Sequence, residues 1–395
     1  MDIFWSICLY YLIFFIAFCL FFVADNINNN TKAKLYIMAG VLVLSAFAGA
    51  RDLSVGIDTY GTVIARFIMV EGASGIEDIV AIKEPLYRYM SFFLHKITDN
   101  PCIFLFVIQL LTAGSVAASL YKLRKKAAIS IGMTVYMLFF YQYSFNIMRQ
   151  SLAAAILLFA FVEYLQGSNL KSVLLAFLSM QFHSSAIIGI ALLIIITMIA
   201  KIENKNARTK VILLSILTGV SFLLNWKILL SFLVSNNILI DHYFVYGAIF
   251  SQEVGYGLHY INAGGTVFLS IFGRAFGLLL ILFMLNGKEK MDDFVVRTLE
   301  YSCIVSFILY SALYLMFNTG LGHRLVLYLD FLQVLLFARV LFGLEQGTAI
   351  YSNGKIRLKS LNSLICVLYP FAYNYILIML RYSFGTLPYM ISKWL

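Results

Sequence analysis

Three arginines beside apolar segments are the side chains of this chain best suited to bind an anion. Arg51 follows a hydrophobic run, Arg149 lies between two such runs, and Arg324 begins another. An arginine stays charged at any working pH, and its planar fork donates two parallel hydrogen bonds to phosphate oxygens. Three such cations in one dry cavity would repel each other without an anion between them. A pyrophosphate carried by a membrane lipid is the natural partner.

Three titratable residues add candidate proton acceptors to the arginines: Asp58, Glu84 and His183. A histidine near its unperturbed pKa takes a proton from a hydroxyl, and a carboxylate can do the same. Arginines stabilise the charge that develops on a departing pyrophosphate without a metal. Together these residues predict transfer of a glycosyl group from a lipid pyrophosphate to an acceptor hydroxyl, with one base and with neither metal nor cofactor.

Each of these residues has a structural alternative, and the sequence leaves both interpretations open. A lone arginine at the end of a span can anchor its helix by extending the head group into the interface, which applies to Arg51, Arg149 and Arg324. The three titratable residues can instead shape a turn, begin a helix or complete a hairpin loop. The catalytic interpretation is favoured because a charged residue beside an apolar run occurs several times, each time on the same predicted side of the membrane.

The elements that must position these residues are membrane helices. Of the 395 residues, 62% are hydrophobic and 12% are charged, whereas a soluble domain carries roughly 25% charged residues. No hydrophilic stretch is long enough for a separate soluble domain, so we predict one all-α, polytopic integral-membrane domain over residues 1–395. The net charge of +10 reflects basic cytoplasmic loops, and no nucleic-acid partner is expected.

Common catalytic and metal-binding patterns are missing from the sequence. The five cysteines lie in or beside apolar runs without a CxxC pair, so neither a disulfide framework nor a zinc site is expected. The chain has no Walker A, HExxH or GxSxG motif, which argues against an ATP-driven pump, a zinc protease and a nucleophile-elbow hydrolase. Residues 3–23 lack the basic start and the cleavage site of a signal peptide, and we predict a retained span there.

Hydrophobic runs predict about twelve spans, since a bilayer crossing needs roughly 20 apolar residues. They lie at residues 3–24, 35–50, 100–121, 127–145, 147–165, 170–182, 185–200, 211–227, 263–285, 298–318, 324–343 and 361–380. Two predicted spans carry an arginine, Arg274 or Arg339. Asp330 and Glu300 are candidate partners for them, and the alternative is extension to the interface.

The basic residues between these runs predict which end of each span faces the cytoplasm. Placing all basic loops in the cytoplasm puts both termini outside, and it requires the run 170–200 to turn back on itself. The only polar cluster in that run is Gln181-Phe182-His183-Ser184-Ser185, so we predict a hairpin at this point.

Two longer connections are predicted on the outer side, at about residues 51–99 and 228–262. In the first, Glu84-Pro85 predicts a helix start, because proline suits the first helical turn, and residues 89–97 predict an interfacial helix. The second connection is rich in glycine and tyrosine, which suits either sugar stacking or an aromatic belt.

Several short motifs that contain these candidate residues follow one another between about residues 50 and 330. They are Arg51 with Gly56-Ile57-Asp58-Thr59-Tyr60, then Glu84, then Phe145-Asn146-Ile147-Met148-Arg149-Gln150-Ser151-Leu152-Ala153, then Gln181-Phe182-His183-Ser184-Ser185-Ala186, then Arg324 with Tyr328. In their order and spacing they resemble the EpsG-like branch of the Wzy polysaccharide polymerases.

The resemblance implies a metal-independent glycosyltransferase of the GT-C type in the bacterial cytoplasmic (inner) membrane, with an active site that faces the periplasm or outside. Such enzymes move a growing glycan from polyprenyl pyrophosphate to a hydroxyl of an incoming lipid-linked repeat unit, with O-antigen favoured over capsule or exopolysaccharide as the product. The implied partners are undecaprenyl-pyrophosphate-linked oligosaccharide repeat units, the lipid bilayer and a chain-length regulator protein.

Carried over by position, the motifs assign a role to each candidate residue. The implied pyrophosphate-binding set is Arg51, Arg149, Gln150, Arg324, Tyr328 and Tyr60. The implied catalytic set is His183, Asp58 and Glu84, with His183 or Asp58 as the base and Glu84 orienting the sugar or the base.

Three other functions compete with a polymerase. An O-antigen ligase uses related chemistry with a different acceptor. A lipid-linked oligosaccharide flippase or other transporter should contain paired broken helices in an internal repeat, and no such repeat is visible. A membrane O-acyltransferase would need a long tunnel for an acyl donor from the cytoplasm.

Overall fold

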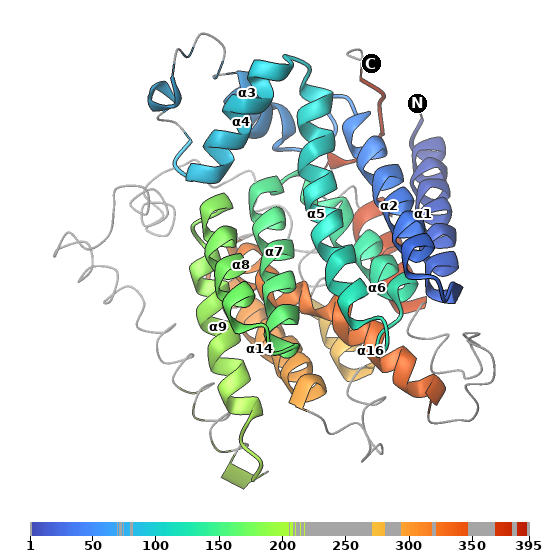
Figure 1. Ribbon diagram of the computed structural model, residues 1–395, viewed down its shortest axis with the longest axis vertical. Helices are drawn as coiled ribbons and strands as arrows, with labels where there is room; N and C mark the ends of the chain where they lie inside the picture. The colour runs from blue at the N-terminus through green and yellow to red at the C-terminus, as the bar shows by residue number, and fades with distance from the viewer. Residues whose placement is uncertain are drawn as a thin grey trace, which may run out of the picture.

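The computed structural model describes residues 2–68, 82–204, 271–280, 294–317, 321–346, 368–380 and 385–392, with scattered positions at 70–79 and 206–217. These residues form a bundle of helices (Figure 1). Within the described ranges, the only strand-like contact is one antiparallel bridge between Arg51 and Ile391. The predicted all-α class therefore holds for the described chain.

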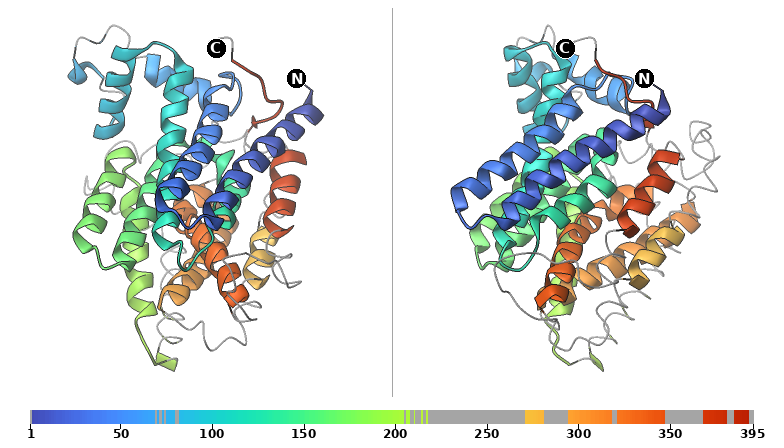
Figure 2. Two further views of the ribbon diagram at one scale, coloured as in Figure 1. Left: turned by 45° about the vertical axis from the view of Figure 1, so that its right-hand side comes forward. Right: turned by 90° about the vertical axis from the view of Figure 1, so that its right-hand side faces the viewer.

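Five described helices are long and apolar enough to cross a membrane, and each coincides with a predicted span. They are α1 (Ile3–Asn26), α2 (Asn30–Gly49), α5 (Pro101–Leu123), α7 (Met148–Leu165) and α14 (Phe294–Phe317). Helices α1 and α2 run side by side in opposite directions (Figure 2). With several such helices, the protein is a multi-pass membrane protein.

The outer helices bury one stripe and present apolar side chains outward on the other. In α1, buried residues recur every three or four positions from Tyr10 to Ala24, the period of one helix face. Between them, Leu12 and Phe15 are exposed. A helix that is hydrophobic all round but buried on only one face is suited to contact lipid on the other.

The predicted span 127–145 is a shorter and less regular element. Helix α6 (Ile129–Tyr136) continues as a π-helix (Met137–Tyr141) and then as a 3₁₀ turn (Tyr143–Phe145). Unwinding frees backbone carbonyls, which a bilayer cannot satisfy. The Asn374 amide donates to the Leu138 carbonyl at 2.7 Å and so compensates one of them. The irregular segment ends at Phe145, three residues before the start of α7 at Met148, which is followed by Arg149.

The predicted hairpin in the run 170–200 is confirmed. Helix α8 (Asn169–Phe182) and helix α9 (Ala186–Ala200) are separated by His183–Ser185 and pack against each other and against α7 (Figure 1). The break follows from chemistry, because the polar residues at this point replace the apolar positions that would continue one helix. His183 ends α8 with an extended backbone.

Basic turns gather at one end of the bundle. Arg124, after α5, bonds to the Asn30 side chain at the start of α2. Gln166, after α7, donates to the Lys122 carbonyl at 2.7 Å. Both termini and helix α4 (Pro85–Ile97) lie at the opposite end (Figure 1). The described chain thus has the two unlike ends that the charge pattern predicts.

One predicted span is broken into two helices. The run expected at 324–343 forms α15 (Leu321–Asp330) and α16 (Leu332–Gln346), which are interrupted at Phe331. Helix α15 is too short to cross a bilayer alone, since ten residues of helix extend about 15 Å. Of two further predicted spans, the structure describes only Ile271–Leu280 and residues 368–380. The predicted span 211–227, apart from residues 214 and 217, and the outer loop 228–262 lie outside the described residues.

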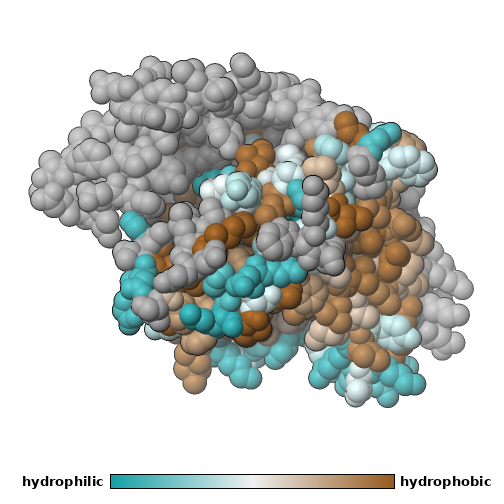
Figure 3. Space-filling view, turned by 90° about the horizontal axis from the view of Figure 1, so that it is seen from above, coloured by the Kyte–Doolittle hydropathy of each residue, from teal (hydrophilic) through white to brown (hydrophobic). Residues whose placement is uncertain are grey.

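A C-terminal segment, residues 385–392, fastens the start of the outer connection to the bundle. The Ser392 N–H donates to the Ala50 carbonyl at 2.9 Å, and the Asp52 N–H donates to the Met390 carbonyl at 2.7 Å. The Gly56 N–H donates to the Gly385 carbonyl at 2.8 Å. Seen from this end, hydrophilic residues gather beside strongly hydrophobic ones (Figure 3).

Candidate functional site

The first ion pair of the site joins Arg149 to Glu84. Arg149 lies in the first turn of α7, and Glu84 precedes α4, which begins at Pro85. Arg149 Nη1 and Glu84 Oε2 are 2.5 Å apart, and the two side chains are 19% and 11% exposed. The guanidinium also lies over the Tyr87 ring, 5.3 Å from its centroid. The Glu84 side chain makes no capping bond to α4, so its carboxylate is available to pair with Arg149.

The second ion pair joins Arg324 of α15 to Asp58 of the outer connection. Arg324 Nη2 and Asp58 Oδ2 are 3.7 Å apart, and the side chains are 45% and 24% exposed. The Asp58 N–H donates to Asn146 Oδ1 at 3.1 Å, which ties the outer connection to the segment before Arg149. This pair is the more open of the two, so its cation is the more accessible to an incoming anion.

A tight turn presents Asp58. Gly56 has φ of +100°, a conformation that side chains other than glycine rarely adopt. A Cβ at Gly56 would also lie 2.5 Å from Thr59 Oγ1. The Thr59 hydroxyl donates to the Val55 carbonyl at 2.8 Å and contacts the Phe145 carbonyl at 3.2 Å. The Gly-Ile-Asp-Thr motif is therefore a turn that requires its glycine and holds its aspartate against the bundle.

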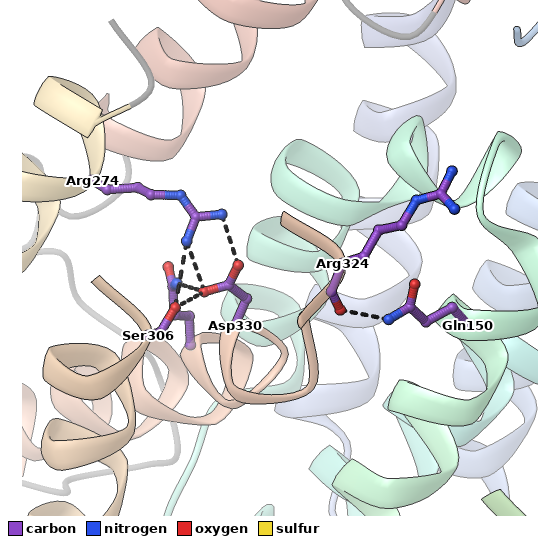
Figure 4. Close-up of polar contacts among 6 residues, drawn as sticks. Gln150, Arg274, Ser306, Arg324 and Asp330 are labelled. Carbon is purple, nitrogen blue, oxygen red and sulfur yellow. Dashed lines mark hydrogen bonds and ion pairs between the residues drawn. The ribbon is translucent and has the colours of Figure 1, made fainter. Parts of the chain in front are cut away.

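Gln150 connects the two ion pairs. It follows Arg149 in α7, and its Nε2 donates to the backbone oxygen of Arg324 at 2.5 Å (Figure 4). The same nitrogen is 3.5 Å from Ser185 Oγ. Gln150 is buried. One amide thus links α7, α15 and the α8–α9 hairpin, so the two arginines belong to one polar cluster.

The hairpin brings a histidine into this cluster. Ser185 Oγ is 2.8 Å from His183 Nδ1 and 2.8 Å from the Tyr328 hydroxyl. Ser185 therefore orients the His183 ring through Nδ1 and joins it to α15. Helix α9 approaches α15 closely here, because a Cβ at Gly189 would lie 2.6 Å from Tyr328 Cβ. His183, Tyr328 and Gln150 thus lie in one network, although they come from distant parts of the chain.

Arg51 has a different position from the one expected. It is only 1% exposed, its Nη1 donates to the Ala48 carbonyl at 2.5 Å, and its guanidinium lies 4.0 Å from the Phe145 ring centroid. Burial lowers the pKa of Arg51 to about 10, which still leaves it charged at neutral pH. Its Nη2 contacts Met148 Sδ at 3.8 Å. Arg51 therefore supports the segment before Arg149 from inside the protein, whereas Arg149 and Arg324 each pair with a carboxylate.

Tyr60 also lies apart from the network. It is 66% exposed, in the π-helix Thr59–Ile64, and in the described structure we find no hydrogen bond or ring contact that joins it to Arg149 or Arg324. Conversely, the structure adds Asn146, Ser185 and Gly189, which the sequence did not single out. The first two lie inside polar motifs that were recognised, whereas nothing in the apolar run around Gly189 indicated its role.

Among the described residues, no three histidine, cysteine, aspartate or glutamate side chains are placed to hold a metal ion. The site is instead a set of paired charges at one end of a helical bundle. These features define a multi-pass membrane protein with a charged polar site near the end of the bundle that carries α4.

Comparison with known families agrees with this class. The model of the EpsG family matches residues 34–391, and the chain belongs to this family. No curated protein and no solved structure matches the chain. Membership of the EpsG family points to a function like that of a polysaccharide polymerase.

Proposed function

We propose that the protein is a membrane glycosyltransferase that polymerises a surface polysaccharide, with O-antigen as the favoured product. It would transfer a growing glycan from undecaprenyl pyrophosphate to a hydroxyl of an incoming lipid-linked repeat unit. The observation that supports this most directly is the network in which Gln150 links the Arg149–Glu84 and Arg324–Asp58 pairs. Two arginines that hold carboxylates in the absence of substrate are suited to exchange them for phosphate oxygens.

The charge balance favours a diphosphate. A diphosphate esterified at both ends carries two negative charges, one on each phosphorus. Asp58 and Glu84 together also carry two, so the negative charge paired with the two arginines stays the same when the diphosphate replaces the carboxylates. A partly buried site penalises uncompensated charge, and this match therefore favours a glycosyl lipid diphosphate over a glycosyl lipid monophosphate, which is a diester with one charge.

The transfer step is a direct displacement. The acceptor oxygen forms a bond to the anomeric carbon, and the bond from that carbon to the diphosphate oxygen breaks, with its electron pair leaving on the diphosphate. Arg149 and Arg324 stabilise this developing charge. The acceptor proton passes to a base, for which His183, held in the network by Ser185, is one candidate. Asp58, once displaced from Arg324, is the alternative base.

The proposed topology places this site on the outer side of the bacterial cytoplasmic membrane. The basic turns at the opposite end of the bundle would then lie in the cytoplasm. In this arrangement the chain has about twelve spans and a GT-C-type architecture, and the polyprenyl tails enter from the bilayer between helices. A chain-length regulator protein is a further proposed partner.

The test is Arg149→Ala in cells that make a long O-antigen. A polymerase defect leaves single repeat units on the lipid A core, whereas a bare core indicates a ligase. Loss of repeat units from the periplasmic leaflet indicates a flippase. Arg149→Lys should rescue chain length only in part, because an ammonium group lacks the fork geometry. Arg124→Ala, which removes an arginine from the opposite end of the bundle, is the matched control and should keep long chains.

A further inference from the structure

A second charged cluster lies inside the bundle, centred on Asp330 at the end of α15 (Figure 4). Arg274 Nη1 is 3.0 Å from Asp330 Oδ1, and Arg274 Nη2 is 2.7 Å from Oδ2, which is a bidentate pair. The Ser306 hydroxyl donates to the same carboxylate, and Gln333 Nε2 lies 3.2 Å from Oδ1. Asp330 is 2% exposed. The structure thus assigns Asp330, one of the two partners the sequence allowed, to Arg274.

The donors to Asp330 come from three different elements. Arg274 lies on the helix Ile271–Leu280, Ser306 on α14, and Gln333 on the first turn of α16. One carboxylate therefore fastens the end of α15 to all three. Stability alone is a weak reason for such a pair, because apolar residues of similar volume often stabilise a buried position as well or better. Charges inside a membrane bundle more often mark a functional requirement.

The cluster is too enclosed to be a substrate site itself. The hollow beside it, lined by Arg274, Ser306 and Gln333 among others, has a volume of about 20 Å³, which is room for roughly one water molecule. A sugar or a diphosphate does not fit there. Whatever the cluster contributes to function, it must contribute through the elements that it holds.

The element with functional residues is α15. It carries Arg324 and Tyr328, and it is bonded at its other end by Gln150, which donates to the Arg324 carbonyl. Residues 326–330 are all buried, and the hydrophobic contribution of this burial is not directional. The polar contacts at the two ends are directional, and a shift by one residue would move the helix about 1.5 Å.

We propose that Arg274 and Asp330 are positioning residues that fix the axial register of α15 and thereby the guanidinium of Arg324 in the diphosphate site. The inference rests on the proposed function and deepens it. It predicts that Asp330 acts on diphosphate binding only through Arg324. It also predicts that apolar replacement of the pair restores folding without restoring the site.

The first test measures binding of undecaprenyl diphosphate to the purified full-length protein in nanodiscs. Asp330→Asn should weaken binding roughly tenfold or more, since small misplacements of a binding group are costly. The same change in an Arg324→Ala background should weaken binding by less than about twofold, because the effects of coupled residues do not add. An equal loss in both backgrounds would overturn the proposal.

Two further variants separate positioning from stability. Arg274→Met combined with Asp330→Leu should recover the thermal stability of the wild type while diphosphate binding stays weak, and recovered binding would refute the inference. The matched control is Glu163→Gln, which removes a buried carboxylate from the Lys122–Glu163 pair near the basic turns. This control should leave the dissociation constant unchanged to within about twofold.

The second test needs no ligand. Hydrogen exchange across residues 321–330 of the substrate-free protein should become several-fold faster in Asp330→Asn, whereas Glu163→Gln should leave this segment unchanged. Unchanged exchange in Asp330→Asn would refute the positioning role. A further outcome is that the wild type binds no diphosphate although hydrogen exchange in α15 is faster in Asp330→Asn. That outcome would refute the proposed function and would still support the conclusion that Asp330 fixes the position of α15.

Discussion

The Arg149–Glu84 pair allows a quantitative test of the site, because both partners are mostly enclosed. The side chains are 19% and 11% exposed, and the two atoms are 2.5 Å apart. Arg149→Ala would leave the Glu84 carboxylate without its cation, and Glu84→Ala would leave the guanidinium without its anion. A hydrogen bond to a charged group contributes about 1.5–3 kcal/mol. We expect each single substitution to lower the free energy of unfolding by about 3 kcal/mol, since a partly buried charge is then uncompensated.

The double substitution, Arg149→Ala with Glu84→Ala, measures the energy of the pair itself. With both charges removed, no uncompensated charge is left, so the double variant should be nearly as stable as either single one. The coupling energy in the cycle should be about 3 kcal/mol, measured by chemical denaturation of the purified protein in detergent. Polymerisation should be lost in both Arg149 variants whatever their stability. A coupling energy below about 0.5 kcal/mol would show that the two side chains do not form this pair.

Two glycines give further predictions, each with a control glycine that has open space around it. Gly189→Ala should shorten the polysaccharide and lower stability by about 1–3 kcal/mol, because the added Cβ would lie 2.6 Å from Tyr328 Cβ. Gly114→Ala, where a Cβ meets nothing within 4 Å, should retain wild-type chain length on a polysaccharide gel. Gly56→Ala should abolish long chains, because φ of +100° and the Thr59 hydroxyl both exclude a Cβ and Asp58 is displaced. Gly61→Ala, also in open space, is its control, and equal activity of the Gly56 and Gly61 variants would contradict the turn argument.

Local structure could largely be predicted from the sequence. The five long helices follow from continuous apolar runs, and the break between α8 and α9 follows from the polar residues around His183. The start of α4 at Pro85 follows from the fixed φ of proline. These features depend on neighbours along the chain, which is why composition and spacing are sufficient to place them.

The interruption at Phe331 could not be predicted in this way. Residues 324–343 read as one apolar run, but α15 ends at Asp330, whose carboxylate accepts bonds from three other elements. Such a contact has no local signature. The same holds for Gly189, whose small size matters only because Tyr328 packs against it.

What the sequence by itself determined was a membrane-spanning helical chain with arginines, carboxylates and one histidine beside the ends of its helices. What only the tertiary structure decided was their pairing. Glu84 forms an ion pair with Arg149, and Asp58 forms one with Arg324. Arg51 is instead buried inside the protein against the Phe145 ring. The physical reason is that the energy of a charge depends on the partners and the water within a few ångströms of it. Those neighbours come from segments that the folded bundle, rather than the order of residues, brings together.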